Sequence, residues 1–186
     1  MRLKSIRIKN FRSIKDDFEI VGMEHDISIV GPNSSGKTNV LKAIEMFFTG
    51  PDNRYEYNIK NDLTFDMKGG QTSIVATFTG DRESTIDREF YNSYDELNNF
   101  LEKPKPESND IVLYLTFLSN GSPQYRFFPN EKYRPHVRRE KAAEKQQVAL
   151  SILLSQFSCY YIPSSKSIRE LIDSLLIPFV KQSISS

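Results

Sequence analysis

The sequence lacks the features that mark secreted, zinc-binding and membrane-spanning proteins. It has one cysteine, Cys159, which excludes an internal disulfide, and its two histidines have no metal-ligand spacing to cysteine or carboxylate. The longest apolar stretch, residues 148–162, is interrupted by serine and glutamine and is shorter than the roughly 20 residues that span a bilayer. Charged residues occupy the N-terminus, where a secretory signal would be apolar. We therefore expect a cytoplasmic protein without a membrane partner.

An excess of either charge is also lacking. The 25 lysines and arginines nearly balance the 24 aspartates and glutamates, so no global positive field can hold nucleic acid. Contact with DNA would depend on a local patch. One basic cluster lies within residues 2–15. A second comprises Lys132, Arg134, Arg138, Arg139, Lys141 and Lys145. The simplest interpretation of the second cluster is a solvated helix face, and the alternative is a contact for the DNA backbone.

The length and the apolar pattern predict a single α/β domain over residues 1–186. Alternation around Ile6 and Ile8 predicts a strand that forms a hairpin with residues 18–21, and apolar spacings of three and four predict a helix over 37–48. Further strands are expected at 25–30, 73–78, 85–90, 111–118, 124–128 and 159–162, those from 73 to 128 as an antiparallel meander. Flanking helices are expected at 138–157 and 165–180.

A phosphate-binding loop is the strongest functional signal. Between the expected strand 25–30 and the helix that follows, the sequence reads Gly31-Pro32-Asn33-Ser34-Ser35-Gly36-Lys37-Thr38. The two glycines allow backbone N–H groups to approach phosphates, and the helix start adds its positive dipole end. Lys37 is the candidate catalytic residue because its ammonium can reach the β and γ phosphates, and the Thr38 hydroxyl is the candidate magnesium ligand. We expect ATP and Mg²⁺ as cofactors.

Two segments together resemble a known family. Residues 3–14, which include Asn10-Phe11-Arg12-Ser13, are followed about twenty residues later by residues 31–44, which hold the loop and Asn39-Val40-Leu41. Together they resemble the opening of RecF/SMC-type ATPases, and within them the OLD-family and related bacterial AAA-type ATPases. The short run Tyr160-Tyr161-Ile162-Pro163-Ser164-Ser165 is similar to a strand-and-turn segment of OLD-like heads. The resemblance of the two N-terminal segments covers about the first 50 residues.

The resemblance implies the N-terminal lobe of an ABC-type head, a P-loop NTPase in which two heads dimerise around two nucleotides. Asn33 then matches a loop position near the γ phosphate, and Asn39 belongs to the nucleotide-binding set. Arg12 matches an arginine that can lie close to the nucleotide in such heads. The alternative for Arg12 is a solvated charge beside a buried Phe11.

The family's remaining motifs are missing from these 186 residues. No apolar strand ends in Asp-Glu, as a Walker B motif would, and no Ser-Gly-Gly signature or TOPRIM nuclease segment follows. The candidates for the Q-loop glutamine are Gln71, Gln124, Gln146, Gln147 and Gln156. We therefore expect an incomplete head of an ATPase that serves DNA repair or anti-phage defence, whose missing C-terminal segment or nuclease partner lies elsewhere. The alternatives are an ATP-binding interaction module without hydrolysis and a small phosphotransferase.

Residues 165–186 generate the first testable prediction. Apolar residues at spacings of three and four give the expected helix a nearly complete apolar stripe, with members that include Leu175 and Phe179. If this stripe packs on polypeptide outside the chain, the isolated protein should self-associate. Light scattering over a concentration series should show association that Leu175→Glu/Phe179→Glu abolishes. A monomeric wild type and an unfolded double variant would instead identify the stripe as ordinary core.

Overall fold

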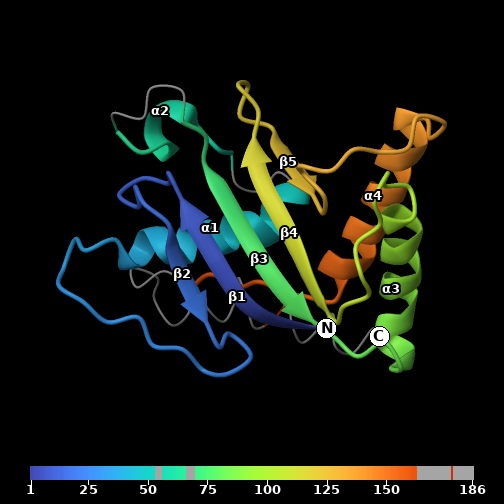
Figure 1. The fold of residues 1–186 in the computed structure, drawn as a ribbon. Helices are drawn as coiled ribbons and strands as arrows, with labels where there is room; N and C mark the ends of the chain where they lie inside the picture. The colour runs from blue at the N-terminus through green and yellow to red at the C-terminus, as the bar shows by residue number, and fades with distance from the viewer. Residues whose placement is uncertain (53–55, 66–69, 163–176, 178–186) are drawn as a thin grey trace.

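The computed structural model describes residues 1–52, 56–65, 70–162 and 177, and at its centre is an antiparallel sheet of five strands. The strand order is β2-β1-β3-β4-β5 (Figure 1). The strands are β1 (Arg2–Lys9), β2 (Phe18–Val21), β3 (Ser73–Thr79), β4 (Asp110–Phe117) and β5 (Pro123–Arg126). The helices are α1 (Lys37–Thr49), the 3₁₀ turn η1 (Gly50–Asp52), α2 (Ile59–Asp62), α3 (Thr85–Asn98) and α4 (Arg139–Ser155).

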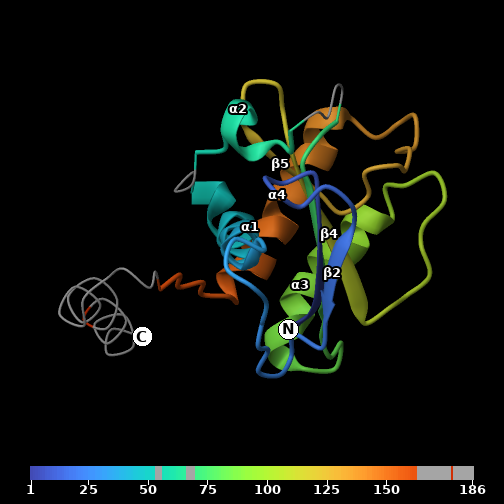
Figure 2. The same ribbon diagram turned by 90° about the vertical axis from the view of Figure 1, so that its left-hand side faces the viewer.

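One face of the sheet forms the core, and α1 covers it (Figure 2). Because side chains alternate along a strand, the register that pairs Ile8 with Ile74 and Ile6 with Ala76 places all four on the same face. All four are fully buried, as is Phe47 of α1. Burial of a side chain of this size contributes about 1.5–3 kcal/mol. The alternation in the sequence therefore fixes both the strand register and the position of α1.

A tyrosine hydroxyl from β5 satisfies the C-terminal end of α1. The carbonyl of Phe47 would normally accept a hydrogen bond from the residue four positions later, but that residue is Pro51, which has no N–H. The Tyr125 hydroxyl donates to this carbonyl over 2.6 Å, and the ring of Tyr125 packs edge-on against the ring of Phe47. The end of the helix is thereby joined to the far strand of the sheet.

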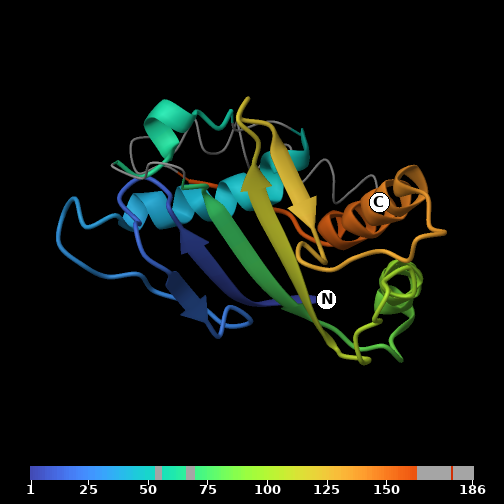
Figure 3. The same ribbon diagram turned by 45° about the horizontal axis from the view of Figure 1, so that its top comes forward.

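Helices α3 and α4 lie side by side beyond β4 and β5, far from the start of α1 (Figures 1 and 3). α4 agrees with the helix predicted over 138–157. The strand predicted over 85–90 is wrong, because these residues begin α3. The Ser84 hydroxyl accepts from the Ile86 N–H as an N-cap, and the buried Phe90, Tyr91 and Leu97 continue at helical spacing.

Two other strand predictions are wrong, and the reason is the same for both. His25 lies in a bend, the rest of residues 25–30 and 159–162 have no regular secondary structure, and no described segment pairs with either stretch. A segment without a hydrogen-bonded neighbour is not a strand of a sheet. Ile27 and Val30 are 40% and 89% exposed. The predicted helix at 165–180 lies outside the described residues except for residue 177. In the described part of the chain, no helix is both long and apolar enough to cross a membrane.

The hydroxyl cap of α1 gives a stability prediction. Tyr125→Phe leaves the buried Phe47 carbonyl with one donor fewer, so we expect the free energy of unfolding to fall by about 1–3 kcal/mol. Tyr114→Phe is the matched control, because Tyr114 of β4 lies on the face of the sheet opposite to Tyr125 and is half-exposed. Urea unfolding followed by circular dichroism measures both. Equal stability of the two variants would contradict a capping role for the Tyr125 hydroxyl.

Candidate nucleotide-binding site

The predicted phosphate loop joins residues 25–30 to the first turn of α1. Gly36 occupies the N-cap position with φ 95°, in the left-handed region that glycine enters without strain. Ser34 also has positive φ, 65°, which is uncommon for a residue with a side chain and is found in tight functional loops. No side chain caps the helix start. The first N–H groups of α1 therefore face outward at the positive end of the helix dipole.

Lys37 folds back over this loop. Its ammonium nitrogen donates to the carbonyl of Gly31 over 2.8 Å and to the carbonyl of Pro32 over 2.7 Å. The side chain is half-buried, while residues 31–35 are exposed. The positive charge of Lys37 is thus held inside the curve of the loop, beside the N–H groups of the first helical turn. A cation and several amide donors in one place form a binding site for phosphate oxygens.

The turn between β1 and β2 contacts the phosphate loop and the start of α1 through Ser13. The Asn39 side-chain amide donates to the Ser13 hydroxyl over 2.8 Å, and a Cβ atom added at Gly36 would lie 2.8 Å from the same hydroxyl oxygen. A side chain at position 36 would therefore displace Ser13. Ser13 thus contacts the phosphate loop directly, although the sequence pattern had singled out its neighbour Arg12. Glycine at position 36 is required both by its φ angle and by this close approach.

Arg12 is held by α2. Its Nε donates to a carboxylate oxygen of Asp62 over 2.9 Å, and its backbone N–H donates to the Asp62 carbonyl over 2.7 Å. Asp62 is 2% exposed, whereas the Arg12 side chain is about one third exposed. Phe11 is fully buried, as expected, but Arg12 is not a merely solvated charge. Nothing in the sequence pattern pointed to Asp62, because its role depends on a contact across 50 positions.

The donor set fits a magnesium nucleotide better than a bare metal ion. Among the described residues, no group of three histidine, cysteine or acidic side chains could hold a metal. Magnesium retains waters and often takes only one or two protein ligands together with phosphate oxygens. The Thr38 hydroxyl is exposed beside Lys37 at the start of α1, where it could serve as such a ligand. The backbone N–H groups and Lys37 would hold the phosphates.

The structure brings the predicted residues 31–39 together on one side of the molecule, with Arg12 on the adjoining turn. Pro32, Asn33, Ser34 and Ser35 are exposed there. The other candidates for chemistry lie elsewhere. In the N-terminal basic cluster, Lys4 pairs with Asp110 and Lys9 with Asp17, so its charge is partly neutralised. Burial raises the pKa of the Cys159 thiol, and Glu45 adds to this, which opposes a nucleophilic role.

Comparisons with known proteins identify the family of the chain. Residues 1–177 match the model of the AAA ATPase domain. The chromosome partition protein Smc of Lactiplantibacillus plantarum is 34% identical over 85 residues, which cover 36% of this chain and 7% of that protein. The chain thus spans a small part of this relative.

A solved structure gives the wider architectural match. It comes from work on the structural biochemistry of ATP-driven dimerization and DNA stimulated activation of SMC ATPases. It aligns with a TM-score of 0.55 and 17% sequence identity over 100% of both chains, a level that establishes the fold. The chain therefore belongs to the AAA ATPase domain family and has the α/β fold of a phosphate-loop ATPase head of the SMC/RecF-like type.

Proposed function

We propose that the chain binds ATP with Mg²⁺ through residues 31–39 and forms the nucleotide-binding part of a head that couples ATP binding and hydrolysis to work on DNA. The observation that carries this proposal is the position of the Lys37 ammonium, held within the loop beside the unblocked start of α1. Lys37 would contact the β and γ phosphates, and Thr38 would contribute the magnesium ligand. Asn33, Asn39 and Arg12 complete the proposed nucleotide set.

Head engagement is the proposed route from ATP binding to function. The matched structure is described in terms of ATP-driven dimerization and DNA stimulated activation. Residues 31–35 are exposed on this chain, so a second head could cover a nucleotide held there. We propose a homodimer of heads that acts in DNA repair or in defence against phage. The OLD-like run at residues 160–165 supports the defence assignment.

A second candidate function is an ATP-binding interaction module that does not hydrolyse ATP on its own. Hydrolysis needs a carboxylate that orients water next to the γ phosphate. Asp110 does not supply one, because it begins β4 and pairs with Lys4 over 2.6 Å. The sequence also has no apolar run that ends in Asp-Glu. This candidate concerns the isolated chain, whereas the ATPase assignment concerns the assembled head.

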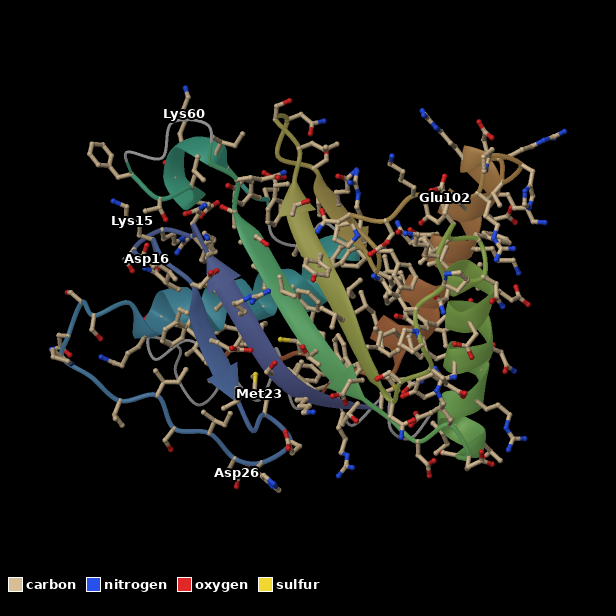
Figure 4. The ribbon with its side chains drawn as sticks, viewed as in Figure 1. Lys15, Asp16, Met23, Asp26, Lys60 and Glu102 are labelled. Carbon is tan, nitrogen blue, oxygen red and sulfur yellow. The ribbon has the colours of Figure 1, made fainter. Side chains whose placement is uncertain are left out.

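Removal of the loop lysine tests the site. Lys37→Ala deletes a charged donor, and because a hydrogen bond to a charged group contributes about 1.5–3 kcal/mol, ATP affinity should fall about 10–100-fold. Lys60→Ala is the matched control, since Lys60 is exposed on α2 and points away from the molecule (Figure 4). Calorimetric titration with Mg-ATP measures both, and circular dichroism checks the fold. Unchanged affinity of a folded Lys37→Ala protein would refute the phosphate-loop assignment.

Turnover distinguishes the two candidates. We expect the purified chain to bind Mg-ATP but to release phosphate no faster than Lys37→Ala, because positioned charge and a water-orienting carboxylate supply most of the catalysis in such sites. Phosphate release measured at several protein concentrations also detects activation by dimerisation. Robust turnover that depends on Lys37 would mean that the chain contains its own catalytic carboxylate.

A further inference from the structure

A second cationic site lies at the opposite end of the molecule from the phosphate loop. The segment that leads into α4 meets the residues after α3 around a cavity of about 570 Å³. Its lining includes Arg134, His136, Arg138 and Lys141, with Phe100 and Val137 between them. We call these six residues the basic pocket. Figures 1 and 3 place the start of α4 beyond β5, whereas the phosphate loop lies beyond β1 and β2.

The charge of the basic pocket is not balanced by any side chain of its own lining. No aspartate or glutamate lines the cavity. In the described part of the chain, no ion pair engages Arg134, Arg138 or Lys141. Nitrogen-tipped side chains gather around the start of α4, and Glu102 is labelled nearby, but Glu102 is exposed and outside the lining (Figure 4). An anion entering the pocket would therefore meet three permanent positive charges and a histidine.

Arg134 is held in place before any ligand arrives. Its backbone N–H donates to the Phe100 carbonyl over 2.9 Å, and its Nε donates to the Leu101 carbonyl over 3.0 Å. The neighbouring Leu101 and Tyr133 form an isolated antiparallel bridge. With Nε fixed, the two terminal nitrogens of the guanidinium present a planar pair of donors. This geometry suits two oxygens of one phosphate group.

The positive charges at the start of α4 are also unfavourable for the helix, because they lie at the positive end of its dipole. Arg138 is the N-cap of α4, and its first turn holds Arg139 and Lys141 beside one acidic residue, Glu140, although the helix dipole favours acidic side chains there. The start of α4 is therefore a place where positive charge lowers helix stability. A bound anion would remove that penalty and interact favourably with the dipole as well.

The floor of the basic pocket is apolar. Phe100 and Val137 are half-buried, and the Lys141 ammonium lies 5.5 Å from the centre of the Phe100 ring. An aromatic surface beside cations can accept the flat face of a base while the cations hold its phosphate. A volume of about 570 Å³ exceeds what a lone phosphate needs. The chemistry fits a phosphate attached to a nucleoside.

We propose that the basic pocket is a second phosphate-binding site of the chain, which takes the phosphate group of a nucleotide, either free or within a nucleic-acid strand. Arg134 would form the paired contact, Arg138 and Lys141 would add charge, and Phe100 would contact the base. The basic pocket contains none of residues 31–39, so the proposal of a second phosphate-binding site does not depend on the proposed ATP site.

The test uses the full chain carrying Lys37→Ala, which removes the loop lysine from the measurement. Binding of a labelled 20-base single strand is followed by fluorescence polarisation at about 50 mM salt, where phosphate contacts are strong. Arg138→Glu/Lys141→Glu should weaken binding at least about tenfold and reduce the salt dependence, because two phosphate contacts are lost. The control Arg88→Glu/Lys60→Glu makes the same change in net charge at exposed positions and should stay within about twofold.

Thermal unfolding separates a binding role from a structural one. Acidic residues at the start of α4 suit the helix dipole, so Arg138→Glu/Lys141→Glu should melt at an equal or higher temperature even though it binds less. Competition by AMP would identify a free nucleotide as a ligand, and competition by unlabelled strand alone would identify nucleic acid. Equal losses in the pocket variant and the control, or no binding by the parent protein to either probe, would overturn the proposal.

Discussion

The packing of α1 against one face of the sheet is the contact on which the rest of the structure depends. Buried side chains of β1 and β3, among them Ile8 and Ile74, meet Phe47 on the helix. This contact fixes the axis of α1 and therefore the place where its first N–H groups emerge. The two ends of the helix are then completed differently, with a tyrosine hydroxyl at the C-terminal end and a glycine in the left-handed region at the N-terminal end.

The turn between β1 and β2 explains why two distant sequence segments occur together. Phe11 anchors the turn in the core, Arg12 joins it to Asp62, and Ser13 joins it to Asn39 at the start of α1. The segment Asn10-Phe11-Arg12-Ser13 is thus a support for the phosphate loop as well as a candidate contact for nucleotide. Both Asn10 and Arg12 adopt positive φ, at 54° and 50°, so the turn keeps an unfavourable backbone conformation that its surrounding contacts maintain.

The sequence predicted the parts of the fold that local pattern determines. Strand β1, helix α1 and the loop before it follow from alternation, helical spacing and two glycines. Residues 85–90 were misassigned because their polar and apolar residues suit a strand as well as a helix until Leu97, about two helical turns beyond the segment, is included. The assignment of residues 25–30 failed for another reason. Local pattern predicts an extended chain there, but strand formation needs a neighbour, and the pattern carries no information about one.

Ser13 and Asp62 were missed because their roles arise only from tertiary contact. Serine in a turn and aspartate near a helix end are common, and neither has a distinctive spacing to the loop. The same limit applies to the basic pocket, where the sequence showed a run of positive residues but not the carbonyl of Leu101 that orients Arg134. Chemistry carried by a contiguous motif can thus be read from residue order, whereas chemistry assembled across the fold cannot.

The hydrogen bonds of Lys37 have a consequence for the heat of nucleotide binding. Two of the three protons of its ammonium are already engaged by the carbonyls of Gly31 and Pro32. A phosphate can accept the third proton while both bonds persist, or it can replace one of the carbonyls, in which case binding exchanges one strong interaction for another. When a carbonyl is replaced, the net enthalpy from this residue is smaller than the strength of the new contact, and the lysine contributes also by setting where the positive charge is held.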